Sequence, residues 1–389
     1  MVDWGWFMRN PSGGNAEARQ DLLDPNGILL PDPARFPSAN DGHGFRALAA
    51  WTHAHGLKFG VHLIRGIPKQ AVRDNAAIAN SSFHAADAAD TTDTCPWDDA
   101  NYGVRDNAAG QAYYDSVLRM IASWDVDFLK VDCISDHPYK PTEIRQIAEA
   151  IRKTGRPIVL SLSPGPTGLS HADEVAQYAQ TWRIADDFWD SWFFRHEHPT
   201  DTFPMGVLQN LDLLAAWNAH VGDGHWPDAD MLPIGVLRPH PGWGDPREAR
   251  FTPDETRTLF TMWAIARSPL ILGTNLTQLS PALRAMLTQR DVIALNQRDG
   301  ESHPVTQLPA ALANTRVWVS TPHGAHEPDT VAIVNAGDQP LETSVSWSAI
   351  GFTQRDRTAR EIWTGRRLRR SGSVHLSIAP HAVALYRVD

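Results

Sequence analysis

Apolar runs that are typical of buried strands alternate with amphipathic helical segments from Met1 to about Asn296. In one such unit Phe45, Leu48 and Trp51 recur at helical spacing, and Gly56 provides a helix end. The apolar residues 57–64 that follow predict a strand. A strand that follows each helix is the signature of parallel β/α units.

The same alternation continues along the chain. We expect helices near 113–124, 142–153, 173–180, 207–220 and 252–267, and strands near 126–133, 157–162, 181–185 and 269–272. The last helix opens with Thr252, Pro253 and Glu255, the pattern of a capping box with proline in the first turn. Repeated units of this kind predict a β/α barrel of the TIM, or (β/α)8, type over residues 1–300.

Beyond Glu301 the pattern changes to short alternating runs separated by Gly, Pro and Asp turns. We expect strands at 316–320, 330–334, 341–347, 361–364, 374–378 and 382–388. These runs predict an antiparallel all-β domain over residues 301–389.

Charge and hydropathy narrow the classes of partner. The 389 residues carry a formal net charge of -10, and the only basic run is 366–370, so we expect no nucleic-acid partner. No apolar run approaches the ~20 residues that span a bilayer, so we expect no membrane partner. Residues 1–7 lack the basic and apolar regions of a secretory signal, which leaves the compartment open.

Acidic residues gather where the predicted strands end, which is where a β/α barrel carries its working groups. Lys130 and Asp132 are two apart on a predicted strand and therefore share a face. The ammonium would hold the carboxylate ionised, as a nucleophile requires. A stabilising ion pair is the alternative interpretation.

Two further acidic segments admit alternatives. Residues 182–190 crowd three carboxylates among aromatic residues, which predicts a raised pKa for at least one of them and hence a general acid, unless they begin a helix. The acids of 225–231 suit hydroxyl binding, calcium or a turn, but lack the glycine and glutamate of an EF-hand loop. The histidine pairs 53/55 and 196/198 would diverge on a helix, which disfavours a metal site.

Seven motifs, taken in order, carry a resemblance over nearly the whole chain. They are the segments 30–37, 56–62, 128–133, 182–192, 226–232, 268–276 and 291–297, with Leu-Lys-Val-Asp-Cys at 129–133 and Trp-Pro-Asp-Ala-Asp-Met-Leu at 226–232. In this combination the sequence resembles glycoside hydrolase family 27, the melibiase or α-galactosidase family.

The resemblance implies the roles of the two central acids. Asp132 matches the nucleophile that attacks the anomeric carbon. Asp187, the fourth residue after Arg183, matches the acid that protonates the leaving oxygen and then acts as a base. The implied reaction is the hydrolysis of terminal α-D-galactopyranosides with retention, through a covalent glycosyl-aspartate and without a metal or other cofactor.

The resemblance also implies a sugar-binding set, and departures from the family lie within it. The positions that match are Asp3, Lys130, Arg183 and Asp230. The departures are Trp4 in place of a second acid that binds a sugar hydroxyl, His62 in place of a tyrosine, and Ser163 at a position that sets selectivity. These departures are similar to the branch that contains β-L-arabinopyranosidases. We therefore expect either a galactoside or an arabinopyranoside glycan as substrate, with activity on both as a further alternative.

Two more expectations come from the same resemblance. Cys95 lies beside the family's disulfide position, and Cys133 is its candidate partner. The sequence begins at the family's second barrel strand, so the first strand and its helix are expected to be missing from the barrel. A catalytically impaired carbohydrate-binding barrel is the alternative from another class of function, and a metal-dependent barrel hydrolase is a third.

Overall fold

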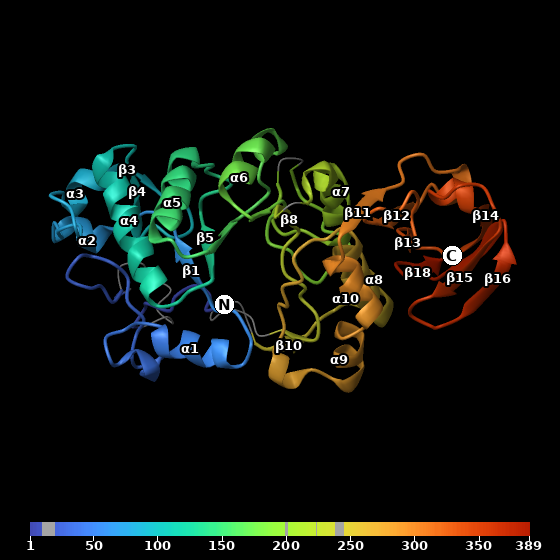
Figure 1. Ribbon diagram of the computed structural model, residues 1–389, viewed down its shortest axis with the longest axis horizontal. Helices are drawn as coiled ribbons and strands as arrows, with labels where there is room; N and C mark the ends of the chain where they lie inside the picture. The colour runs from blue at the N-terminus through green and yellow to red at the C-terminus, as the bar shows by residue number, and fades with distance from the viewer. Residues whose placement is uncertain (10–19, 199–200, 223, 238–244) are drawn as a thin grey trace. The chain divides into compact units, whose positions relative to one another are not determined.

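A computed structural model of the chain describes residues 1–9, 20–198, 201–222, 224–237 and 245–389 (Figure 1). The chain forms two compact units. Unit 1 comprises Met1–Arg183, and unit 2 comprises Ile184–Pro239 and Asp245–Asp389. None of the helices in these described ranges is both long and apolar enough to cross a membrane.

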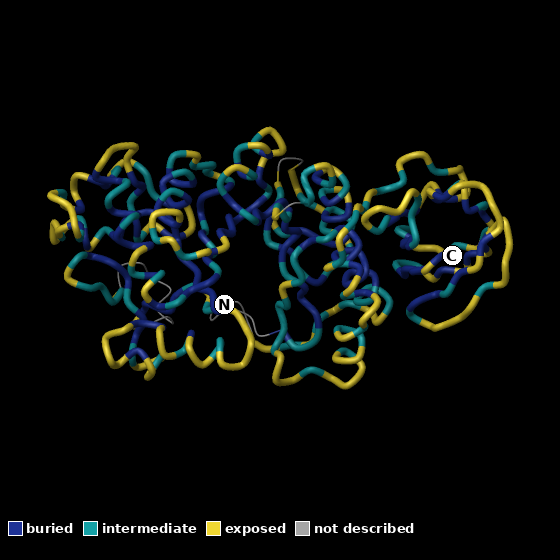
Figure 2. Tube along the Cα trace, in the orientation of Figure 1, coloured by how far each residue is buried: buried dark blue, intermediate teal, exposed yellow. Residues whose placement is uncertain are grey.

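A parallel sheet forms the centre of unit 1. Its strands lie side by side in the order β1 (Gly60–Ile64), β5 (Phe128–Asp132), β6 (Val159–Leu162) and β7 (Thr181–Arg183). Val2 adds a parallel bridge to Val61 on the free side of β1. All five residues of β1 are buried (Figure 2), as expected for a strand covered on both faces.

Helices alternate with these strands as the hydrophobic pattern predicts. They are α1 (Arg46–Ala54), α4 (Ala108–Ser123), α5 (Pro141–Thr154) and α6 (Ala172–Tyr178). The Asn107 side chain caps α4 by accepting the Gly110 N–H at 2.8 Å. Gly155 ends α5 in the left-handed conformation, where a Cβ would be strained. The predicted strand over 57–64 begins only at Gly60.

An excursion between β1 and α4 was not predicted from the sequence. It contains β2 (Ile67–Pro68), α2 (Lys69–Arg73), α3 (Ala85–Ala88), β3 (Ala89–Thr94) and β4 (Asn101–Val104). The strands form a small antiparallel sheet in the order β2-β4-β3. These elements are two to six residues long, and β3 is mostly polar, so they carry little hydrophobic periodicity. The connection between β3 and β4 carries Cys95 and Asp98.

The first part of unit 2 is mainly helical. It contains α7 (Val207–Trp217), α8 (Pro253–Ile265), α9 (Pro281–Leu287) and α10 (Arg290–Gln297), with short strands β8 (Trp226–Asp228), β9 (Val236–Leu237) and β10 (Arg247–Glu248). The predicted strand at 269–272 is wrong, because that stretch makes only a single parallel bridge, from Leu272 to Leu232. Residues flanking this bridge are partly exposed, and within the described residues no second bridge extends it into a ladder.

The end of unit 2 is an antiparallel β-sandwich. One sheet has the order β11-β12-β13-β18-β15-β16 and the other pairs β14 with β17. Their bounds are Gly300–Pro304, Thr315–Pro322, Thr330–Asn335, Leu341–Ser346, Arg357–Glu361, Arg367–Ser371, Ser373–Ile378 and Val383–Val388 for β11 to β18 in chain order. Trp347, Ile333 and Leu376 are fully buried between the sheets.

Three strands of the sandwich differ from the prediction. β11, which pairs with β12, was not predicted. The run at 361–364 is not a strand, because only Glu361 belongs to β15 and the chain then turns toward β16. β16 itself was missed: it is the basic run at the edge of the sheet, and its side chains are mostly exposed. An edge strand with charged side chains has no apolar alternation to detect.

The capping box of α8 offers a test of stability. Thr252 Oγ1 accepts the Glu255 N–H at 3.1 Å, and Glu255 Oε2 accepts the Thr252 N–H at 2.8 Å. We expect Thr252→Ala to lower the free energy of unfolding by about 1 kcal/mol, because a helix N–H loses its partner. Chemical denaturation would measure the change. Thr252→Ser keeps the hydroxyl and is the control, and equal midpoints for the two variants would contradict the prediction.

Candidate active site

The register of the parallel sheet places the predicted site residues of unit 1 on one face. His62 pairs with Lys130, Lys130 pairs with Ser161, and Ser161 pairs with Thr181. Side chains alternate along a strand, so the residues two positions further along project from the same face. These residues are Asp132, Ser163 and Arg183. The sheet therefore brings the acid, the cation and the polar side chains together where its strands end.

The Asp132 carboxylate lies among groups that favour its ionised form. Its Oδ1 accepts the Cys133 N–H at 2.8 Å, and its Oδ2 lies 3.6 Å from His62 Nε2. Burial raises the pKa of Asp132, but His62, Lys130 and the Cys133 N–H together hold that pKa well below its usual range. The Asp132 side chain stays 20% exposed, so it is not fully removed from solvent. This is the electrostatic state that a carboxylate nucleophile needs.

Asp3 and Trp4 follow the parallel bridge made by Val2. Asp3 Oδ1 accepts the Trp4 N–H at 2.8 Å. Asp3 is exposed as a residue, but the surrounding protein partly desolvates its carboxyl group, which acts to raise its pKa. Lys130 and His62 outweigh this effect, so the pKa of Asp3 lies below its usual value. Asp3 and Asp132 therefore share the same neighbouring cation.

The Trp4 indole is fixed at both its polar and its apolar parts. Its Nε1 donates to Asp98 Oδ2 at 2.9 Å, and its ring packs against Ile64, Cys95 and Cys133. Asp98 was missed in the sequence analysis. Its position three residues after Cys95, in the loop that the disulfide ties to the end of β5, is the signal that could have indicated it.

Ser163 and Arg183 are both buried at the ends of their strands. The Ser163 N–H donates to the Val131 carbonyl at 2.9 Å, which extends the ladder one residue beyond β6. The Arg183 carbonyl accepts both the Thr167 N–H at 3.0 Å and its hydroxyl at 2.7 Å. These contacts fix the main chain at both positions.

Cys95 and Cys133 form a disulfide, with their Cα atoms 6.0 Å apart. Both residues are buried. The bridge joins the connection between β3 and β4 to the residue that follows Asp132, so it links two segments that lie 38 residues apart in sequence.

Asp187 lies in unit 2 on a segment whose main chain is held at two consecutive residues, Asp187 and Phe188. The Asp187 N–H donates to Asp186 Oδ1 at 2.8 Å, and the Asp187 carbonyl accepts the Met205 N–H at 3.0 Å. The next residue, Phe188, donates its N–H to Asp230 Oδ2 at 2.8 Å. Such a rigid main chain restricts where the Asp187 side chain can point.

Asp230 supports this segment through its own carboxylate. Its second oxygen, Oδ1, accepts the Met231 N–H at 2.7 Å, and its carbonyl accepts the Trp263 indole N–H at 2.9 Å. Asp230 has a positive φ of 77°, a conformation that these contacts stabilise in a residue other than glycine. Its sugar-binding role stays a prediction.

The other two acids of the 182–190 segment have structural partners. Asp186 Oδ2 accepts the Thr202 hydroxyl at 2.9 Å. Asp190 pairs with both terminal nitrogens of Arg247, at 2.5 and 2.7 Å. Burial alone would raise the pKa of Asp190. Arg247 and the Arg250 N–H outweigh this effect and hold the pKa below its usual range. Sequence reasoning missed Arg247, which lies 57 residues away and carries no local signal.

The protein has a parallel β/α domain with a charged carboxylate at a strand end, and an antiparallel sandwich follows it. This combination is typical of barrel enzymes that act at the carboxyl ends of their strands. Comparison with known proteins gives the family. The profile described as alpha galactosidase A matches residues 100–298, and the profile described as alpha galactosidase C-terminal beta sandwich domain matches residues 313–388.

Individual relatives agree with these profiles. An α-galactosidase A of Cellvibrio japonicus is 26% identical over 379 residues, which cover 94% of this chain and 79% of that protein. The crystal structure of a family 27 β-L-arabinopyranosidase from Geobacillus stearothermophilus is 36% identical, with a TM-score of 0.88 over 100% of this chain and 87% of that one. A variant of that enzyme, solved in complex with arabinose, matches with the same identity and TM-score.

The chain belongs to glycoside hydrolase family 27, the melibiase or α-galactosidase family, and it is a glycosidase. The predicted fold class, a β/α barrel domain followed by an antiparallel β domain, is confirmed by these matches and by the two kinds of sheet.

The charge balance around Asp3 and Asp132 gives a test that does not depend on catalysis. Lys130 lowers the pKa of both carboxyl groups, so Lys130→Met should raise both pKa values. Carbon-13 NMR titration of aspartate-labelled protein would measure them. Lys153→Met removes an exposed lysine that pairs with Asp115 and is the control. Unchanged titration of both acids in Lys130→Met would contradict the assignment.

The same substitution predicts a change in acid stability. A carboxyl with a lowered pKa stabilises the fold above its unfolded pKa, and that stabilisation is lost as the pH falls through the folded-state pKa. Lys130→Met should therefore lose less stability between neutral and acidic pH than the wild type does, which denaturation at several pH values would show.

Proposed function

We propose that the protein is a retaining exo-glycosidase that cleaves a single terminal pyranose of galacto configuration. The observation that carries the proposal is the Asp132 carboxylate at the end of β5, kept ionised by Lys130, His62 and the Cys133 N–H and still accessible to solvent. Asp132 is also the residue of the 129–133 motif that matches the family nucleophile. The ionised state agrees with that role.

The proposed reaction has two displacement steps. Asp132 attacks the anomeric carbon while the bond to the leaving oxygen breaks and Asp187 donates its proton to that oxygen. Asp187, now a carboxylate, takes a proton from water, and the water oxygen attacks the same carbon and releases Asp132. Two inversions retain the anomeric configuration, and water restores in the second step the proton that Asp187 gives up in the first.

Sugar recognition is assigned to the polar residues on the same face of the sheet. In this proposal Lys130, Asp3 and His62 bind hydroxyl groups in unit 1, and Ser163 and Arg183 bind from the neighbouring strands. Asp230 acts in unit 2, beside the segment of Asp187. Charged and polar groups on rigid strand ends are suited to fix the orientation of a polar ring.

The Trp4 ring favours β-L-arabinopyranosides over α-D-galactopyranosides as the preferred substrate. The two sugars differ by one hydroxymethyl group, and Trp4 occupies the position of an acid that binds a sugar hydroxyl in α-galactosidases. Because Asp98 and the disulfide hold the indole, it cannot easily move aside for a larger substituent. The 36% identity to a β-L-arabinopyranosidase supports the same preference. An α-D-galactopyranoside is the competing substrate.

Removing the nucleophile tests the reaction. Asp132→Asn keeps the size of the side chain but removes its charge, so kcat should fall by a factor on the order of 10⁴ on either p-nitrophenyl glycoside. A fluorinated glycoside that traps the covalent intermediate should label Asp132 in the wild type, as peptide mass spectrometry would show. Label on another residue, or full activity in Asp132→Asn, would refute the nucleophile assignment.

A rate comparison tests the substrate. The wild type should have the higher kcat/KM on p-nitrophenyl β-L-arabinopyranoside, and Trp4→Ala should shift the ratio toward the α-D-galactopyranoside by roughly tenfold, because space opens for one hydroxymethyl group. Trp51 lies on α1 and is 60% exposed, so Trp51→Ala is the control and should leave the ratio unchanged. A wild type that prefers the galactoside would reverse the substrate assignment.

A further inference from the structure

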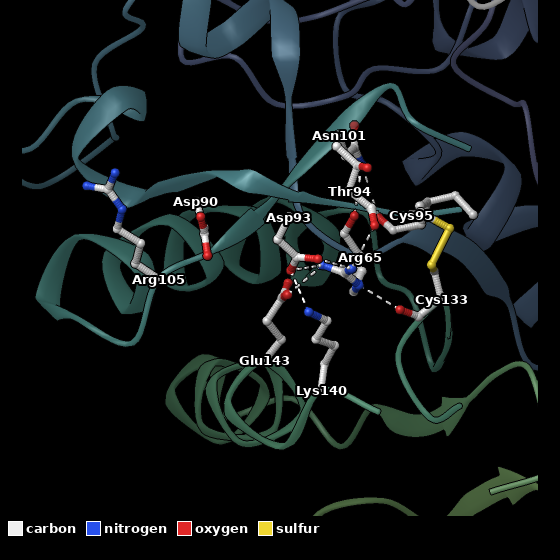
Figure 3. Close-up of polar contacts among 12 residues, drawn as sticks. Arg65, Asp90, Asp93, Thr94, Cys95, Asn101, Arg105, Cys133, Lys140 and Glu143 are labelled. Atoms are coloured by element: carbon white, nitrogen blue, oxygen red, sulfur yellow. Dashed lines mark hydrogen bonds and ion pairs between the residues drawn. A yellow bond between two sulfur atoms is a disulfide. The ribbon is translucent and has the colours of Figure 1, made fainter. Parts of the chain in front are cut away.

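Arg65 is the first residue after β1 and is bound to the main chain on both sides of the Asp132–Cys133 peptide bond. Its own N–H donates to the Asp132 carbonyl at 3.1 Å. Its side-chain Nε donates to the Cys133 carbonyl at 2.6 Å, as Figure 3 shows. One residue therefore contacts the carbonyls of two successive residues at the end of β5.

Two acids hold the Arg65 guanidinium in place. Asp93 accepts a bidentate pair of hydrogen bonds, 3.0 Å each, and Glu143 accepts one at 2.9 Å (Figure 3). The Arg65 side chain is only 1% exposed. Lys140 Nζ pairs at 2.7 Å with Asp93 Oδ2, which is one of the two oxygens that accept from Arg65. The Tyr114 hydroxyl donates to Glu143. A buried guanidinium with this many partners has a fixed position.

The Cys133 peptide in turn orients the Asp132 carboxylate. The Cys133 N–H donates to Asp132 Oδ1, so its direction decides which carboxylate oxygen is occupied. Cys133 has a positive φ of 62°, which is uncommon for a residue other than glycine and must be maintained by its surroundings. Its carbonyl is held by Arg65 and its sulfur by Cys95.

We infer that Arg65 is a positioning residue for Asp132: by holding the Cys133 carbonyl, its side chain fixes the backbone conformation of Cys133, the residue whose N–H orients the Asp132 carboxylate. The inference rests on the proposed function, since it takes Asp132 as the nucleophile. Arg65 contacts no reacting atom, and its effect passes through the main chain. A change of about 1 Å in the placement of a reacting oxygen is enough to lower a rate about a hundredfold.

An arginine is suited to this role because its Nε can hold the Cys133 carbonyl while its two terminal nitrogens hold the acids. A lysine has one nitrogen and cannot occupy both places. Arg65→Lys therefore keeps the charge opposite Asp93 and Glu143 and removes the Nε–H group that donates to the Cys133 carbonyl. This substitution separates the electrostatic role of Arg65 from its positioning role.

The test measures kcat and KM of Arg65→Lys on a p-nitrophenyl glycoside. We expect kcat to fall roughly ten- to a hundredfold with little change in KM, and the acidic limb of the pH profile to move to higher pH, because the Cys133 N–H stabilises the ionised carboxylate less well. Lys140→Met removes another cation from Asp93 without touching Cys133 and is the matched control. A wild-type kcat in folded Arg65→Lys would overturn the inference.

A second variant keeps the test valid if Arg65→Lys does not fold. Arg65→Met combined with Glu143→Gln removes one charge of each sign and leaves the Lys140–Asp93 pair intact. Its kcat should fall as in Arg65→Lys, whereas Glu143→Gln alone, which retains the Arg65 contact with Cys133, should keep kcat near the wild-type value. Equal kcat values for these two variants would also overturn the inference.

The disulfide provides a check that Arg65 acts through Cys133. Arg65 and Cys95 both restrain Cys133, so the loss of kcat in Arg65→Lys combined with Cys95→Ala should exceed the product of the two separate losses. Losses that simply multiply would show that Arg65 does not act through Cys133.

Asp132→Asn in the wild-type background separates the nucleophile hypothesis from the hypothesis about Arg65. If Asp132→Asn retains activity, the proposed nucleophile is wrong. An inactive Asp132→Asn with a fully active Arg65→Lys refutes only the role of Arg65.

Discussion

The structure of the site depends on keeping one carboxylate charged in a place that is partly removed from water. Desolvation of Asp132 opposes its ionisation, and the sheet offsets this with Lys130, the His62 ring and the Cys133 N–H. Lys130 is paired in register with His62, and Asp132 lies two residues further along the same strand. A shift of one residue in this ladder would move the cation and the acid to the other face.

The main chain beside both acids of the proposed mechanism is rigid, but different groups restrain it at each acid. At Asp132 the restraint comes from side chains: Arg65 and Cys95 both act on the residue that follows it. At Asp187 the Met205 N–H donates to the carbonyl, and the Asp186 and Asp230 carboxylates accept the N–H groups of Asp187 and Phe188. In both cases the groups beside the acid have partners that fix their direction, which is how a preorganised site limits reorganisation during reaction.

Elements with strong periodicity were predictable from the sequence, and weakly patterned ones were not. The helices α4, α5 and α8 and the strands β5 and β13 lie close to their predicted ranges, because an apolar stripe or run decides their burial. The strand predicted at 269–272 failed because a short apolar run does not by itself provide a neighbouring strand. The small sheet of β2, β3 and β4 was missed since β2 and β4 are only two and four residues long and β3 is mostly polar, so none of them shows a clear apolar pattern.

The sequence by itself determined the β/α and all-β order, the place of Asp132 beside Lys130 and the family motifs, because these depend on spacings of a few residues. Only the tertiary structure decided which distant groups meet. Arg65 reaches Glu143, 78 residues away, Trp4 reaches Asp98, 94 residues away, and Asp190 pairs with Arg247. A charged side chain shows no periodicity that names its partner, so such contacts follow from how the strands and loops are packed.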